Sequence, residues 1–146
     1  MAEYKELSND QIRSVVIEKL RRFPLFDELA GFIDVVKDEN GIVDVSCREK
    51  RGKLGRITHF DLELQGESCH ILEIGLEKLR RNKENTGRLY STCEEIARSL
   101  GCEEITRVPC GHFPDGERIE NYLEKIGYEE LGREEFYGIL VMAKTL

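Results

Sequence analysis

A run of basic residues in the second half of the chain lies just before a predicted helix. Between positions 78 and 88, five side chains are basic and one is acidic, a local net charge of +4 in a chain whose formal net charge is -7. These residues are Lys78, Arg80, Arg81, Lys83 and Arg88, with Glu84 as the acid. Unpaired N–H groups and the dipole at a helix start attract phosphate, and nearby Lys and Arg strengthen the attraction. The segment therefore indicates either a phosphate site or a solvated loop in a chain that is 35% charged.

Two short pairs, Cys69-His70 and Cys110-x-His112, contain side chains that can bind metals. Structural zinc sites usually combine two tight pairs with spacers of about two to four residues, and these pairs lack that pattern. Cys110 beside His112 is also a candidate nucleophile, a weaker hypothesis. We expect no metal. The five cysteines are odd in number and include no C-x-x-C, which predicts reduced, mostly buried thiols in a reducing compartment.

The elements that must position these residues change between helix and strand along the chain. Ser8 and Gln11 form a capping box at a helix start. Asn40-Gly41 favours a turn before an antiparallel meander of three strands. In chain order the expected elements are a strand over 2–7, helices over 9–21 and 25–37, strands over 42–45, 57–64 and 69–76, a helix over 86–100, a strand over 105–108, a helix over 114–126, and strands over 128–131 and 136–143.

This order predicts a single domain over residues 1–146 with an α/β (α+β) fold. The order β-α-α-β-β-β-α-β-α-β-β implies a mixed, mostly antiparallel central sheet of about seven strands with helices on both faces. No apolar run reaches the ~18 residues of a membrane span, and the start of the chain lacks the pattern of a signal peptide. A pI near 5.1 leaves no general basic face for nucleic acid. We therefore expect a cytoplasmic protein that binds neither membranes nor nucleic acid.

Residues 81–101 resemble a motif of the GNAT superfamily of acyl-CoA N-acyltransferases. In that family a strand is followed by R-x-x-G-x-G/A and then by a helix that carries A-R-x-x-G. Here Glu84 and Thr86 take the positions of the two motif glycines. Residues 120–128 resemble the late signature F-Y-E-K-L-G-F of the same family. The resemblance covers nearly the whole chain in element order and implies a divergent GNAT member.

The resemblance implies acetyl-CoA as co-substrate and transfer of its acetyl group to an amine by direct attack. Loop amides would hold the pyrophosphate, and the pantetheine would pair with the edge of the strand over 69–76. The implied cofactor-binding residues are Leu76, Arg81, Asn82, Lys83, Glu84, Asn85, Thr86, Gly87 and Arg88. The acceptor would be a small-molecule or peptide amine, and the acidic remainder of the chain favours a cationic one. A monomer and a homodimer are both compatible with the sequence.

The resemblance also implies a general base near the strand over 69–76, and Glu73 is our candidate. Strict alternation along this strand places Leu72, Ile74 and Leu76 on one face and Glu73 with Gly75 on the other. Burial beside a cofactor cleft would raise the pKa of such a carboxyl, as base chemistry near neutral pH requires. The alternative is a solvated surface carboxylate in a chain with 29 acidic residues.

Tyr122 is our candidate for the acid that protonates the departing thiolate. Many family members use a Tyr on the last helix at the position that aligns here with Leu123. Tyr122 precedes it by one residue, a rotation of about 100° on a helix, so packing in the core is the alternative. The residues at the Glu84 and Leu123 positions leave a second reading open: a catalytically inactive, GNAT-like CoA-binding or regulatory module.

Overall fold

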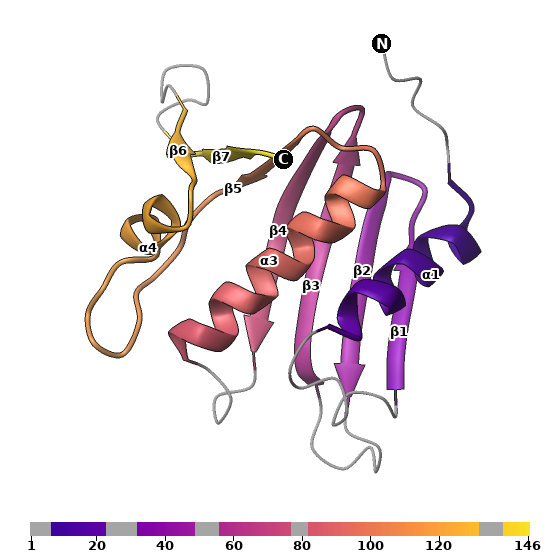
Figure 1. Cartoon of the computed structure of the whole chain (residues 1–146), viewed down its shortest axis with the longest axis horizontal. Coiled ribbons are helices and arrows are strands. Elements are labelled where there is room, and N and C mark those ends of the chain that lie inside the picture. Colours follow the sequence, from indigo (N-terminus) through magenta and orange to yellow (C-terminus); the bar gives the residue numbers. More distant parts are fainter. Residues whose placement is uncertain (1–6, 23–31, 49–55, 77–81, 132–138) are drawn as a thin grey trace.

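The computed structural model describes residues 7–22, 32–48, 56–76, 82–131 and 139–146 (Figure 1). The described part contains three helices and one seven-stranded sheet. In chain order these are α1 (Asn9–Leu20), β1 (Phe32–Lys37), β2 (Ile42–Arg48), β3 (Arg56–Gln65), β4 (Ser68–Leu76), α3 (Lys83–Ser99), β5 (Glu104–Arg107), α4 (Ile119–Lys125), β6 (Glu129–Glu130) and β7 (Met142–Thr145).

The first helix begins where the capping box predicts. The Ser8 hydroxyl accepts the N–H of Gln11 at 3.2 Å, and the Gln11 side-chain oxygen accepts the N–H of Ser8 at 2.8 Å. The helix buries Ile12, Val16 and Leu20, which lie at helical spacing. The prediction for this segment is confirmed.

The helix expected over 25–37 is wrong in its last six residues, which form β1. β1 pairs with β2 in antiparallel register, from Phe32 opposite Arg48 to Lys37 opposite Val43. The β-branched residues of this segment favour an extended strand once a neighbouring strand is available. Residues 23–31 lie outside the described part of the chain. So does the strand expected over 2–7, except Leu7, which is in no strand.

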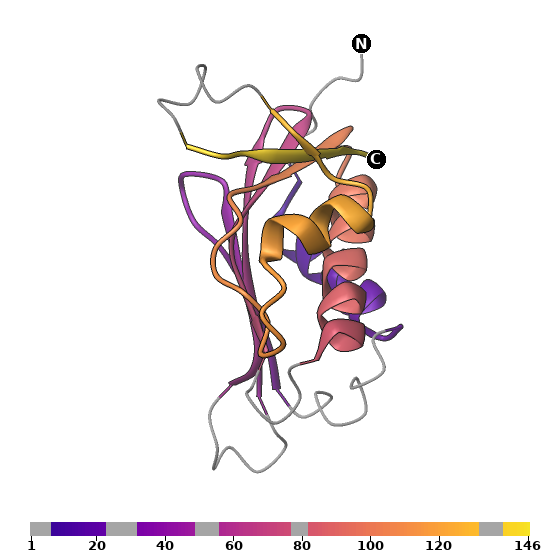
Figure 2. The same cartoon turned by 90° about the vertical axis from the view of Figure 1, so that its left-hand side faces the viewer.

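The sheet order is β1-β2-β3-β4-β5-β7-β6, and every pairing is antiparallel except that of β4 with β5. The prediction of a mixed, mostly antiparallel sheet is therefore confirmed. The meander of β2, β3 and β4 is also confirmed. α1 and α3 contact each other and lie on the same face of the sheet (Figures 1 and 2). These two helices thus share one face of the sheet (Figure 2).

Four of the five cysteines are buried among apolar side chains, as expected of small hydrophobic residues, and all five are free thiols. Cys47, Cys69, Cys93 and Cys102 are buried, and Cys110 is exposed. Within the described residues no group of three or more His, Cys, Asp or Glu side chains could hold a metal ion. No helix in the same part of the chain is both long and apolar enough to cross a membrane.

The later helices begin at residues other than those predicted. α3 begins three residues before position 86, because Asn82 caps it by accepting the N–H of Asn85 at 2.7 Å. α4 begins five residues after position 114. The intervening residues form a turn in which Phe113 donates its N–H to Glu117 O at 2.8 Å. The strand expected over 136–143 is found only at its end, in β7, and residues 132–138 lie outside the description.

A buried polar network connects α3 to the last part of the sheet. Glu94 of α3 accepts hydrogen bonds from the Tyr128 hydroxyl at 3.0 Å and from Lys144 Nζ at 2.7 Å. Lys144 also donates to Ile126 O at 2.9 Å, just after α4. These bonds fix the ends of α4 and β7 against the helix that forms one side of the candidate site.

Candidate functional site

The two parallel strands at the centre of the sheet separate part-way along β4. β5 pairs with β4 only from Ser68 to Ile71, while β4 continues to Leu76. The β3 side of β4 stays paired throughout, up to Thr58 opposite Leu76. Beyond Ile71, the side of β4 that faced β5 is therefore no longer covered by that strand.

A β-bulge marks the point of separation. Asp61 pairs with Glu73 and the next residue, Leu62, pairs with Ile71, so Leu72 is an extra residue in β4. The bulge returns Ile74 to the same face as Ile71. The strict alternation predicted for Leu72 is consequently wrong: its side chain is exposed.

Arg107, the last residue of β5, spans the gap at the bulge. Its Nη1 donates to Ile71 O at 3.1 Å and to Leu72 O at 2.9 Å. These bonds replace backbone pairing at the point where it ends and fix the guanidinium between the two strands. The sheet is thereby held open rather than closed by a further rung of strand pairing.

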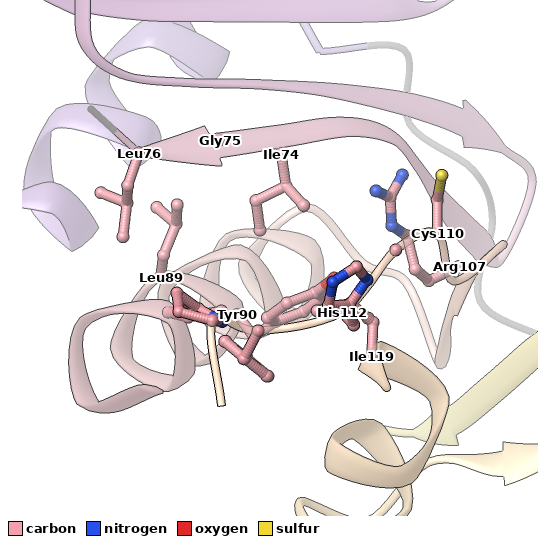
Figure 3. Close-up of a pocket in the computed structure, with 13 residues that line it drawn as sticks. Ile74, Gly75, Leu76, Leu89, Tyr90, Arg107, Cys110, His112 and Ile119 are labelled. Atoms are coloured by element: carbon pink, nitrogen blue, oxygen red, sulfur yellow. The ribbon is translucent and has the colours of Figure 1, made fainter. Parts of the chain in front are cut away.

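A cavity of about 350 Å³ lies at this opening, within the range of small-molecule sites. β4 contributes Ile74, Gly75 and Leu76, and α3 contributes Thr86, Leu89 and Tyr90. Arg107, Cys110 and His112 line it from β5 and the segment that follows. Figure 3 shows Ile74 and Leu76 pointing from the strand toward Leu89 of the helix, with Arg107 and Cys110 together at one end.

The basic segment predicted to hold phosphate lies at the start of α3, but its described charges have protein partners. Lys83 Nζ lies 2.5 Å from Asp115 Oδ2 and 3.2 Å from Glu117 Oε1. These contacts raise the pKa of Lys83. Arg88 pairs with Glu84 at 2.6 Å, one helical turn apart. The helix start therefore carries less net positive charge than the sequence predicts.

Three residues implied as cofactor ligands and expected before the helix, Lys83, Glu84 and Asn85, form the first turn of α3 instead. The Thr86 amide donates to Asn82 O at 2.9 Å, and the Asn85 amide donates to the Asn82 side chain. Those two N–H groups are thus already used within the helix start. Thr86 and Leu76 line the cavity as expected of cofactor-binding residues. Arg81 lies outside the described residues.

Tyr122 lies across the first turn of α3. Its hydroxyl donates to Lys83 O at 2.9 Å, and its ring contacts Phe113 edge to face at a centroid distance of 5.0 Å. A Cβ on Gly87 would overlap that hydroxyl, so the glycine allows the close approach. Burial is the main cause that raises the pKa of Tyr122. Leu123, the next residue, is fully buried in the core.

Glu73 lies on the sheet face opposite Ile74, as the sequence predicts, and Gly75 shares that face. Its side chain is 67% exposed and lies 3.8 Å from His59 Nε2. Gly75 gives the imidazole room, since a Cβ there would come within 2.7 Å of His59 Cε1. Glu73 is not among the residues that line the cavity, and neither is Tyr122.

Comparison with solved structures shows that the fold is similar to that of several acetyltransferases. The PaiA N-acetyltransferase from Thermoplasma acidophilum, solved in complex with coenzyme A, aligns over 97% of this chain and 97% of its own, with a TM-score of 0.55 and 14% identity. An aminoglycoside 6'-N-acetyltransferase from Enterococcus faecium covers 97% and 94%, with a TM-score of 0.53 and 15% identity. An acetyltransferase assigned to the GNAT family, from Desulfovibrio desulfuricans, covers 72% and 69%, with a TM-score of 0.52 and 11% identity.

The chain has the GNAT fold. The match is one of structure: no protein-family model and no curated protein matches the sequence. The fold resemblance inferred from motif spacing is therefore confirmed, although the motif glycines themselves are replaced.

Sequence reasoning missed several contributors to the cavity in this GNAT fold, among them Arg107 and Ile119. Arg107 was included in a predicted strand. A charged residue at the end of a strand is a signal for a site residue, and it was available in the sequence. Ile119 lines the cavity from the start of α4, a position that follows only once the turn over 113–118 is known. Cys110 and His112, offered in the sequence only as a weak Cys/His pair, both line the cavity.

Proposed function

We propose that this protein is an N-acyltransferase that moves an acetyl group from acetyl-CoA to an amine. The observation that carries the proposal is the separation of β4 from β5 at Leu72, which opens a cavity between β4 and α3 within the GNAT fold. A pantetheine arm is extended and carries two amides, so it can pair with a strand edge. Ile74 and Gly75 of β4 line the cavity on the side where β5 has departed.

Direct transfer needs the amine and the thioester in one site. The ammonium first loses one proton to a base. The neutral nitrogen then forms a bond to the thioester carbonyl carbon, the C–S bond breaks, and the second proton lost by nitrogen is taken up by the CoA thiolate. Positioning of this kind accounts for much of the rate gain in such reactions. In this scheme Glu73 is the proposed base. It lies on the sheet face opposite the cavity-lining Ile74 and is 67% exposed, so it would have to take the proton through water.

Tyr122 is the proposed acid, and it would have to release the Lys83 carbonyl to donate a proton elsewhere. The acceptor is proposed to be a small-molecule or peptide amine, cationic at neutral pH, because the chain is acidic overall. A cytoplasmic location fits a supply of acetyl-CoA.

A second candidate function is a GNAT-like module that binds CoA without turnover or acts as a regulator. One observation favours it: the described cations at the start of α3 are paired with protein carboxylates. Lys83 is held by Asp115 and Glu117, and Arg88 by Glu84. A pyrophosphate would have to compete with these partners.

Thermal shift and turnover assays separate the two candidates. Acetyl-CoA at millimolar concentration should raise the melting temperature, and free thiol should accumulate when amines from a panel are added. Thr86→Trp fills the cavity and should abolish both effects. Ser91→Trp on the same helix, at an exposed position, is the matched control and should abolish neither.

A thermal shift without thiol release would support the non-catalytic module. An absence of any shift with CoA, acetyl-CoA or longer acyl-CoAs would refute both candidates.

A further inference from the structure

Arg107 has a charge that the described part of the protein leaves unpaired. No described carboxylate lies within ion-pair distance of its guanidinium, and its Nε–H is buried without a hydrogen-bond acceptor among these residues. Three basic residues of α3 and of the segment before α4 differ: Lys83, Arg88 and Arg118 each have a carboxylate partner. A half-buried cation without a counter-ion is unfavourable, so an anion at this position would be stabilising.

The rest of the cavity is suited to the apolar part of a ligand. Its described lining includes the side chains of Ile74, Leu76, Leu89 and Ile119, and no acidic residue. Among these described lining residues, the Arg107 guanidinium is the one permanent charge. The cavity therefore combines an apolar body with a single cationic end, inside a protein of net charge -7.

The position of the guanidinium is fixed before any ligand binds. Nη1 is committed to the carbonyl oxygens of Ile71 and Leu72, which hold the side chain at the point where the strands separate. The guanidinium also makes a side-chain hydrogen bond with Tyr90, another lining residue, and its Nε–H has no acceptor in the described part of the protein. A planar fork of this kind recognises a carboxylate better than a neutral amide, because both hydrogen bonds are charge-assisted.

We propose that the substrate bound in this cavity carries a carboxylate that Arg107 holds. This proposal rests on the proposed acyl transfer and specifies its substrate class. The carboxylate has two sources: an acyl chain that ends in a carboxylate, as in a dicarboxylic acyl-CoA, or the α-carboxylate of an amino-acid acceptor. Arg107 is then a specificity-determining residue, since the neutral analogue of the same shape leaves the cation without a partner.

A probe that contains no CoA tests the carboxylate site independently of catalysis. Hexanoate and hexanamide have the same apolar chain, and only hexanoate is charged at pH 7. Each is titrated into the full chain while the Nε–Hε resonance of Arg107 is followed by NMR. Hexanoate should bind about tenfold or more tightly than hexanamide, the size expected of a charge-assisted pair.

Variants assign this preference to Arg107. Arg107→Gln should abolish the preference, and Arg107→Lys should retain part of it. Arg118→Gln, an exposed arginine paired with Glu120 away from the cavity lining, should leave it unchanged. The circular dichroism spectrum and unfolding temperature of each variant establish that it is folded before binding is compared.

Turnover assays then identify the source of the carboxylate. The donor arm compares succinyl-CoA with butyryl-CoA, and the acceptor arm compares amino acids with their amides. A preference of about tenfold for the carboxylate in one arm, lost in Arg107→Gln, identifies that source.

Equal affinity for hexanoate and hexanamide, or a preference that persists in folded Arg107→Gln, would overturn the carboxylate proposal. Hexanoate selectivity without binding or turnover of any acyl-CoA would leave the carboxylate site standing and refute acyl transfer. Acyl-CoA turnover without carboxylate preference would support acyl transfer and refute the carboxylate site.

Discussion

Replacing Gly87 by Ala tests the contact between α3 and α4 at the candidate cofactor site. In a helix interior Ala is more favourable than Gly by about 1 kcal/mol, so helix propensity alone predicts stabilisation. The structure predicts the opposite, because a Cβ on residue 87 would overlap the Tyr122 hydroxyl. Tyr122 would have to move and lose its 2.9 Å hydrogen bond to Lys83 O.

The expected change in the free energy of unfolding follows from three contributions. Loss of the hydrogen bond costs about 1 kcal/mol, and overpacking costs about 1–3 kcal/mol. The gain in helix propensity offsets about 1 kcal/mol of this. We therefore expect Gly87→Ala to lower the free energy of unfolding by about 1–3 kcal/mol.

A double-mutant cycle isolates the contact. In a Tyr122→Phe background the nearest ring atom, Cζ, lies 3.7 Å from the Cβ position, which is ordinary van der Waals contact. There Gly87→Ala should be neutral or stabilising, which gives a coupling energy of about 2 kcal/mol between the two sites. Urea unfolding followed by circular dichroism measures all four proteins. Stabilisation of about 1 kcal/mol in both backgrounds would refute the packing described for Tyr122.

Three further outcomes are expected. Glu94→Ala should lower the free energy of unfolding by about 2–3 kcal/mol, because it removes the acceptor of Tyr128 and the carboxylate partner of Lys144, which keeps only Ile126 O. Tyr128→Phe should lower it less; an equal or larger loss for Tyr128→Phe in urea unfolding would contradict this. Burial lowers the pKa of His70 below its ordinary 6.5, so between the two values the unfolded chain binds more protons. Stability should therefore fall as pH decreases from 7 through this window, and His70→Gln should remove that part of the slope. Iodoacetamide should label Cys110 first, since the other thiols are buried and burial raises the pKa of Cys47 to about 12. Acetyl-CoA should slow the labelling of Cys110. Mass spectrometry that finds Cys47 labelled as fast as Cys110 would contradict this expectation.

Local signals in the sequence were sufficient for the elements that depend on local chemistry. The capping box at Ser8 predicted the start of α1, and the glycine at position 101 predicted the end of α3. The sheet class and the meander followed from hydrophobic alternation. The fold family followed from the joint spacing of motifs, even though the glycines of the main motif are absent.

Features that depend on tertiary pairing were not predictable in the same way. Residues 32–37 carry apolar spacing compatible with a helix, and pairing with β2 makes them a strand. The bulge at Leu72 arises from a register shift against β3, and no residue type in β4 predicts it. That bulge decides which side chains of β4 face the cavity.

The charge of the basic segment was similarly misjudged from sequence alone. Local counting gave a net positive helix start, but Asp115 and Glu117 are more than thirty positions away in the sequence and lie against Lys83 in the fold. Arg107, by contrast, was predicted only as part of a strand, and in the fold its guanidinium lines the cavity. The distribution of charge in the folded protein thus differs from that along the chain.

An NMR titration of acetyl-CoA into the labelled protein tests the central claim most directly. A second cavity of about 490 Å³ on the opposite face of the sheet, lined in part by His70, Thr106 and Val141, provides an internal comparison. The account predicts saturable shifts of the Ile74 and Gly75 amides and of Cys110, with the opposite-face residues unaffected. Shifts confined to the opposite face, or no saturable shift at all, would contradict it.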